Sequence, residues 1–215
     1  DDPILFEQNE DPHATLMAGI LIYNKLEECL ESFEEIKISH KLESVKMFKE
    51  KDIDSPELYG FSTAQAIYET ESKNPLYKRI ITMPVSTDDQ YKYKNYMGDG
   101  KPTSWSAGID ALCFGSYEGE KSDKRLMILA AGNTRFEELY EDDYRISVIN
   151  HSVEDPGQSW NALTIGAYTN KAFLSDEEGF EIYKPLVEPG GFSPFNSSSM
   201  HWESKWPVKP DIVLE

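Results

Sequence analysis

The fold of this chain is limited chiefly by one short apolar segment, which ends in small residues and an amide side chain. Residues 125–133 read R-L-M-I-L-A-A-G-N, and the run from Leu126 to Leu129 is typical of a strand buried in a parallel sheet. Gly132 permits a turn, and Asn133 follows just beyond the carboxyl end of the strand. Open α/β sheets bind their ligands at this edge. Asn133 is therefore the first candidate functional residue, and the alternative is an amide that satisfies its own turn.

The rest of the chain alternates between strand-like and helix-like segments. We expect strands at 40–48, 79–86, 126–129, 160–167 and 208–215, and helices at 16–30, 59–72 and 103–115. This alternation predicts an α/β fold, a three-layer α/β/α arrangement with a mainly parallel sheet. Residues 88–101 are expected to form a long polar loop, residues 135–150 an irregular segment, and residues 170–191 an exposed excursion.

Length and charge limit the classes of protein. At 215 residues the chain is long enough for one substantial core, so we expect a single domain over residues 1–215. Its 39 acidic and 21 basic residues give a formal net charge of −18, which argues against nucleic-acid or membrane partners because phosphates require Lys and Arg. No apolar run reaches the roughly 18 residues that span a bilayer. No signal peptide opens the chain either, which decides nothing for a fragment, so the compartment stays open, with the cytoplasm favoured.

Several residues that often carry chemistry are expected to be structural here. Cys29 and Cys113 fit neither a zinc motif nor a disulfide framework and are expected to be reduced thiols. His40, His151 and His201 are expected to face solvent or to play structural roles, and residues 151–157 to form a polar turn. His13 differs from these residues because it lies at the start of an apolar helix, an unusual place for a histidine. It is therefore a candidate for a functional role.

Four segments, in order along the chain, resemble the catalytic domain of subtilisin-like serine proteases, the subtilases. Residues 13–19 (H-A-T-L-M-A-G) resemble the H-G-T-x-x-A-G signature around the catalytic histidine. Residues 129–133 (L-A-A-G-N) resemble the stretch whose asparagine completes the oxyanion hole. Residues 161–167 (N-A-L-T-I-G-A) are similar to the strand that follows, and 192–198 with 209–213 (F-S-P-F-N-S-S and K-P-D-I-V) to the run before the nucleophile. The histidine and W-N-A-L-T segments look most like a bacterial branch.

This resemblance implies a serine endopeptidase acting on peptides or proteins, with His13 as catalytic base and Asn133 as oxyanion donor. Both residue types suit these roles, since imidazole has a pKa near 6.5 and a side-chain amide donates to developing negative charge. By the same resemblance, residues 79–86 correspond to the strand that lines the substrate groove. No cofactor is required, and calcium enters only by family resemblance, because no ligand cluster stands out in the sequence.

The chain also departs from the family pattern. Ala14 replaces the glycine of H-G-T, and the V-x-D-[ST]-G motif of the family's aspartate is missing. None of the early aspartates has its apolar context (Asp1, Asp2 and Asp11). The nucleophile motif G-T-S-M-A does not occur, and Ser199-Met200 precedes K-P-D-I-V, whereas the family nucleophile follows it. We therefore expect the central part of a catalytic domain, incomplete at both ends and inactive by itself.

Two alternatives remain open at this point. The first is a catalytically dead subtilase-fold module used for peptide binding or scaffolding. Ala14 is its main support, because alanine strains a backbone that needs positive φ or close approach. The flanking sequence would distinguish an active protease from this inactive module, since an active enzyme must encode the D-[ST]-G and G-T-S motifs. The second alternative, an unrelated α/β hydrolase, requires a G-x-S-x-G elbow, and none occurs.

Overall fold

The structure is a computed structural model that describes residues 13–47, 56–87, 100–119, 121–134, 139, 143–174, 179–180, 182–202 and 207–215. Most of the expected polar loop, residues 88–99, and the early aspartates lie outside this part of the chain. The chain divides into two compact units, Asp1–Lys46 and Met47–Glu215. None of the described helices has the length and apolar character that a membrane span requires.

The first unit contains two helices, α1 (His13–Tyr23) and α2 (Leu26–Glu31), where the sequence predicted one. The break falls at Asn24, which adopts a φ of 58° while its N–H still bonds the carbonyl of Ile20. Asn tolerates this left-handed conformation better than most residues, so it can end a helix. The strand expected at 40–48 is wrong: residues 40–47 form no regular element, and no described strand pairs with them.

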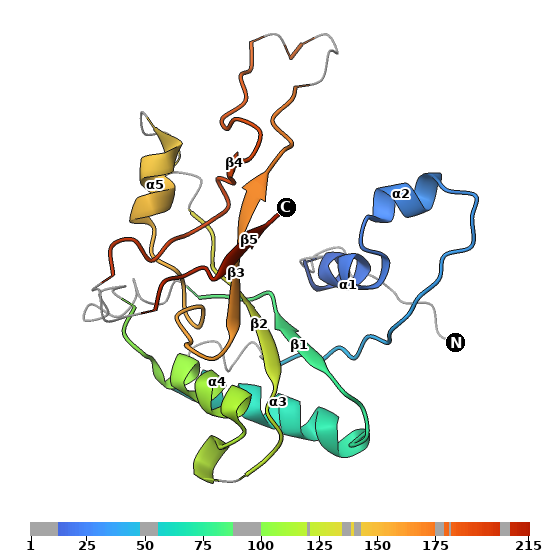
Figure 1. The fold of residues 1–215 in the computed structure, drawn as a ribbon, viewed down its shortest axis with the longest axis vertical. Coiled ribbons are helices and arrows are strands. Elements are labelled where there is room, and N and C mark those ends of the chain that lie inside the picture. Colours follow the sequence, from blue (N-terminus) through green and yellow to red (C-terminus); the bar gives the residue numbers. More distant parts are fainter. Residues whose placement is uncertain are drawn as a thin grey trace. The chain divides into compact units, whose positions relative to one another are not determined.

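The second unit is built on a five-stranded sheet, shown in Figure 1. Its strands are β1 (Ile80–Met83), β2 (Leu126–Ala130), β3 (Leu163–Thr169), β4 (Gly191–Phe192) and β5 (Ile212–Leu214). The strands β1, β2, β3 and β5 run parallel, and only β4 is antiparallel. Met83 pairs with Leu129, and Ala130 with Ile165. The mainly parallel α/β fold is thus confirmed, and the segments that follow β1 and β2 leave the sheet at one edge.

Helices α3 (Tyr59–Lys73) and α4 (Ser104–Phe114) form close to where the sequence predicts them. Thr103 caps α4 through a reciprocal capping box with Ser106, and Gly115 ends it at a φ of 78°. The sequence does not predict the helix α5 (Tyr144–Asn150), because its pattern over residues 135–150 indicates an irregular segment. Asp143 provides its cap by accepting a hydrogen bond from the backbone N–H of Arg145.

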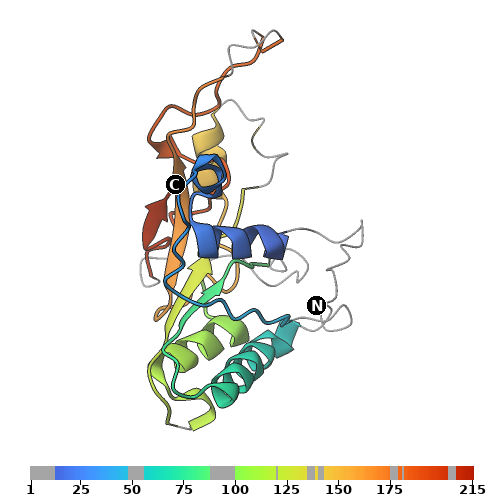
Figure 2. The same cartoon turned by 90° about the vertical axis from the view of Figure 1, so that its right-hand side faces the viewer.

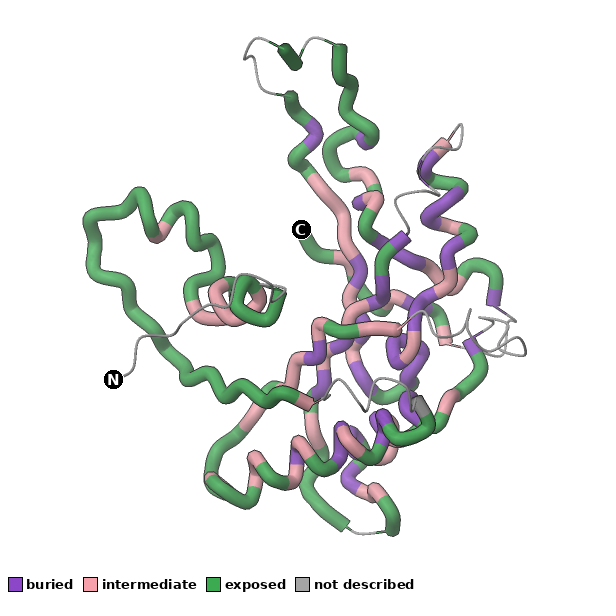
Figure 3. The backbone as a smooth tube through the Cα atoms, turned by 180° about the vertical axis from the view of Figure 1, so that it is seen from behind, coloured by how far each residue is buried: buried purple, intermediate pink, exposed green. Residues whose placement is uncertain are grey.

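The main core lies between this pair of helices and the first two strands. Figures 1 and 2 both place α3 beside α4 at the β1–β2 side of the sheet, and Figure 3 shows buried positions along these helices and strands. Trp105, Ile109 and Leu112 of α4 pack in one cluster with Met127 and Leu129 of β2. Each such side chain contributes roughly 1.5–3 kcal/mol through burial. This core holds the carboxyl end of β2 in place.

The two cysteines are both free, as predicted, but they differ in environment. Cys113 is buried in α4, and burial, followed by the nearby charge of Asp110, raises the pKa of its thiol from 9.0 to about 11. Cys29 is half-buried in α2. A thiol with so high a pKa is almost entirely protonated near neutral pH, so Cys113 is suited to packing rather than to nucleophilic chemistry.

A buried ion pair fixes the start of β2 against α3. Arg125, with 6% of its side chain exposed, donates from Nε and Nη2 to the two carboxylate oxygens of Glu71 at 2.7 and 2.8 Å. Its Nη1 donates to the carbonyl of Leu112 at 3.0 Å, and its guanidinium lies 5.3 Å from the centre of the Tyr68 ring. The hydrogen bonds that Arg125 donates to Glu71 raise the pKa of the guanidinium above its ordinary value.

We expect Arg125→Ala to lower the free energy of unfolding by about 3 kcal/mol, because it leaves Glu71 without its partner. This is the lower end of the usual range for a broken buried pair, since 30% of the Glu71 side chain is exposed. Denaturant unfolding of the full-length protein measures the change. Arg145→Ala is the matched control, because Arg145 donates to both carboxylate oxygens of Asp143 in the same way but has a side chain that is 66% exposed. Equal shifts for both variants would contradict the prediction.

Candidate functional site

Asn133 lies in the turn that follows β2, at the carboxyl edge of the sheet. Its side chain is exposed, whereas its neighbours Ala131, Gly132 and Thr134 are buried. Gly132 has a φ of 103°, a conformation that favours glycine, and it turns the chain between the buried strand and the exposed amide. Within the described part of the chain, no hydrogen bond occupies the side chain of Asn133.

The turn is anchored on both sides of Asn133 by buried hydrogen bonds. The hydroxyl of Ser197 donates to the carbonyl of Ala131 at 2.6 Å. The backbone N–H and the hydroxyl of Thr134 both donate to the carbonyl of Asn196. Ser197 and Asn196 come from the serine-rich segment that precedes β5, and both are buried. The amide of Asn133 is therefore presented to solvent from a fixed backbone.

A buried carboxylate, that of Glu154, lies directly behind this turn. Glu154 is only 8% exposed, and its backbone N–H donates to the carbonyl of Ala131 at 2.9 Å. The hydroxyl of Ser86, just beyond β1, donates to its Oε2 at 2.5 Å, and Nε2 of the buried His151 lies 3.4 Å from its Oε1. The side chain also packs against Gly132, where an added Cβ would lie 2.6 Å from Glu154 Cγ.

Sequence reasoning missed this cluster of Ser86, His151 and Glu154. Residues 151–157 were expected to be a polar turn, and a glutamate in such a turn is usually a surface charge. The hydrogen bond from Ser86 to Glu154 joins residues 68 positions apart in the sequence, so no local sequence pattern predicts it. The one available signal was the parallel sheet itself, which predicts that the segments following β1 and β2 meet at one edge.

His13 is the first residue of α1, in the unit Asp1–Lys46, and its side chain is exposed. Asn133 belongs to the other unit, Met47–Glu215. Ala14 lies in the first turn of α1. Among the described residues other than glycine, only Asn24 and Glu118 adopt a positive φ. The backbone of residue 14 therefore carries none of the conformational strain that a required positive φ would have imposed.

Ser199 has a structural contact that distinguishes it from a nucleophile. Its hydroxyl accepts a hydrogen bond from the backbone N–H of Lys209 at 2.7 Å. Lys209 is itself buried, and its ammonium donates to Asp211 at 2.7 Å and to the carbonyl of Ala162 at 3.0 Å. The carboxylate of Asp211 in turn accepts the backbone N–H of Thr164. The K-P-D segment and Ser199 thus hold β5 against β3.

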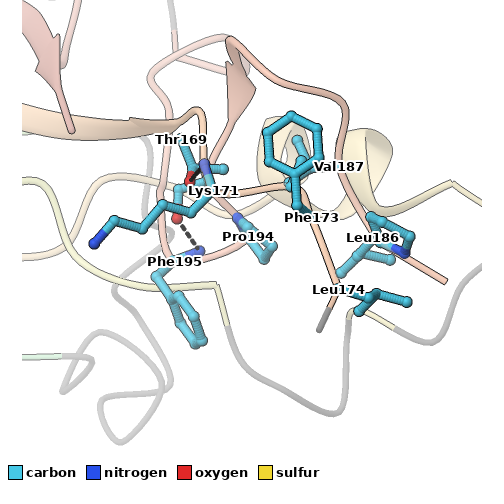
Figure 4. Close-up of a pocket in the computed structure, with 11 residues that line it drawn as sticks. Thr169, Lys171, Phe173, Leu174, Leu186, Val187, Pro194 and Phe195 are labelled. Atoms are coloured by element: carbon cyan, nitrogen blue, oxygen red, sulfur yellow. Dashed lines mark hydrogen bonds between the residues drawn. The ribbon is translucent and has the colours of Figure 1, made fainter. Parts of the chain in front are cut away.

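A separate apolar hollow of about 290 Å³ lies beyond the end of β3, where residues 169–174 meet 185–187 and 193–195 (Figure 4). Its walls carry mainly carbon, from Phe173, Leu174, Leu186, Val187 and Phe195. In Figure 4 the backbone N–H of Phe195 bonds the hydroxyl of Ser193, at 3.1 Å. Among the described residues that line the hollow, Lys171 is the one ionisable side chain, and no His, Asp, Glu, Cys or Tyr accompanies it there. Nor does any group of three or more His, Cys, Asp or Glu residues suited to a metal ion occur in the described ranges.

The model of the Subtilase family, Peptidase_S8, matches residues 1–215, which is the whole chain given. The chain therefore belongs to the subtilase family of serine peptidases, whose substrates are peptides or proteins. In the comparisons with curated proteins and with solved structures, nothing matches. The predicted family and the α/β fold are thus confirmed.

Proposed function

We propose that residues 1–215 are the central part of a single subtilase catalytic domain that hydrolyses peptide bonds. His13 acts as the general base and Asn133 as the oxyanion donor. The G-T-S nucleophile motif and the D-[ST]-G aspartate motif do not occur in this sequence, so the serine and the aspartate come from elsewhere in the full-length protein. Residues 1–215 alone would then have no peptidase activity.

The geometry around Asn133 is the observation that carries this proposal. Its side-chain amide is exposed, it has no hydrogen bond among the described residues, and it stands on a turn fixed by Thr134 and Ala131. An oxyanion donor needs such preorganisation, because a donor that is already aimed need not reorganise during the reaction. An amide that merely closed its own turn would be bonded to nearby backbone.

The proposed reaction is acyl transfer through a serine. The serine hydroxyl attacks the scissile carbonyl carbon while His13 takes the hydroxyl proton. The carbonyl oxygen becomes an oxyanion and accepts a hydrogen bond from the amide of Asn133. When the C–N bond breaks, His13 returns the proton to the leaving amine, and water then releases the acyl group by the same steps. Serine acylation needs no cofactor, and calcium, suggested only by the family, would have no part in these steps.

A fluorophosphonate probe tests this proposal in the full-length protein. We expect one labelled serine, in a G-T-S peptide outside residues 1–215, when the labelled peptide is mapped by mass spectrometry. Ser199→Ala is the matched control and should label normally, because the Ser199 hydroxyl holds the backbone of Lys209. Labelling at Ser199 would contradict the assignment of the nucleophile. A folded protein that takes no label would be a catalytically dead member of the family.

A further inference from the structure

The buried glutamate behind the Asn133 turn is a charged group that the proposed reaction does not use. A carboxylate that is 8% exposed is costly to bury unless hydrogen bonds replace its water. Ser86 and His151 supply these contacts from segments on either side, one after β1 and one after α5. Burying a carboxylate costs free energy that burying an apolar residue would not cost. We therefore expect Glu154 to have a role in the structure around it.

The contacts of Glu154 converge on the backbone that carries Asn133. Its N–H bonds the carbonyl of Ala131, and its Cγ and Cδ lie 2.6 and 2.7 Å from the position that a Cβ of Gly132 would take. Gly132 is therefore closed in on that side by the glutamate side chain. Removing the side chain would open a space behind Gly132 and let the turn relax into it, because cavities left in packed regions collapse in part.

We propose that Glu154 is a positioning residue for Asn133: its side chain, fixed by Ser86 and His151, forms the wall that holds the Gly132 turn and aims the Asn133 amide. This inference rests on the proposed function of Asn133 as oxyanion donor. In this role Glu154 acts through the turn and not by contact with the reacting atoms. Its effect on the reaction passes entirely through the turn, so the effect must vanish when the amide of Asn133 is absent.

The experiment is a double-mutant cycle in the full-length protein, with kcat and KM measured on a peptide substrate. We expect Glu154→Ala to lower kcat by about 10- to 100-fold with KM within about threefold, since a displaced donor affects chiefly the transition state. In the Asn133→Ala background, the same substitution should change kcat by less than about threefold. Glu154→Gln keeps the size and an acceptor for Ser86, so it should retain most of the activity. Glu188→Ala, at an exposed glutamate, controls for loss of charge.

Equal losses from Glu154→Ala in both backgrounds would overturn the inference, since the effect would then not pass through Asn133. If Asn133→Ala itself leaves kcat unchanged, or if the wild-type protein has no turnover, the proposed function fails and this inference fails with it. Ser86→Ala, which removes only a hydroxyl donor, provides the same comparison if Glu154→Ala does not fold. The proposal is supported if Ser86→Ala lowers kcat in the wild-type background but not in the Asn133→Ala background.

Discussion

His13→Ala in the full-length protein should lower kcat on a peptide substrate by about 10⁶-fold, with a much smaller change in KM. A serine hydroxyl is a weak nucleophile until a base takes its proton, and removal of that base disables the serine as well. The magnitude is the one known for the catalytic histidine of subtilisin, a member of this family, and is carried over from there. The residual rate would come from the oxyanion donors and from substrate binding.

Steady-state kinetics with purified variants measure this effect, and His201→Ala is the matched control. His201 is also exposed, but its ring contacts the side chain of Asn150 at 2.7 Å and it has no proposed part in the reaction. Its substitution should leave kcat and KM unchanged. The midpoint of denaturant unfolding should also be nearly the same for His13→Ala and the wild-type protein. A loss of less than tenfold for His13→Ala would show that another residue is the base.

Asn133→Ala should lower kcat by about 10²- to 10³-fold while leaving KM nearly unchanged. The loss follows from removing one oxyanion donor, and its size is again that known for subtilisin. Stability should not change, because the side chain is exposed and has no hydrogen bond among the described residues. Asn133→Asp should be at least as harmful, since a carboxylate of the same shape cannot donate and repels the oxyanion.

The matched control for this prediction is Asn170→Ala, at the residue that directly follows β3. Asn170 is exposed too, and its amide donates to Glu215 at 3.2 Å. Its substitution should leave kcat unchanged, although the contact to Glu215 is lost. A rise in KM without a fall in kcat for Asn133→Ala would contradict the assignment, since it would indicate ground-state binding rather than stabilisation of the transition state.

The elements that the sequence predicted well are those with local determinants. The helix α4 begins and ends where Thr103 and Gly115 cap it, and β1 ends at Met83, directly before Pro84. The strand β2 follows from its apolar run. These signals act between residues close in sequence, so they can be read without knowledge of the fold.

The errors occur where a distant partner decides the structure. Residues 40–47 alternate in the manner of a strand, but a strand requires a neighbour to pair with, and none of the described strands provides one. The apolar pattern over 16–30 continues through Asn24, where the backbone turns to a φ of 58°. The helix α5 was missed because its composition is not strongly periodic, and Asp143 caps it nonetheless.

The residues of the candidate site fall into the same two groups, those marked by local motifs and those brought together from distant segments. The family and the two candidate residues His13 and Asn133 follow from local sequence motifs, because each residue lies in a short contiguous segment. The position of Glu154 behind Gly132 and its hydrogen bond with Ser86 depend on the folded chain, since these residues come from separate segments. Burial of a carboxylate depends on which segments surround it. That arrangement arises from the pairing of β1 with β2 and the return of residues 151–157 beneath their ends, and no local pattern encodes it.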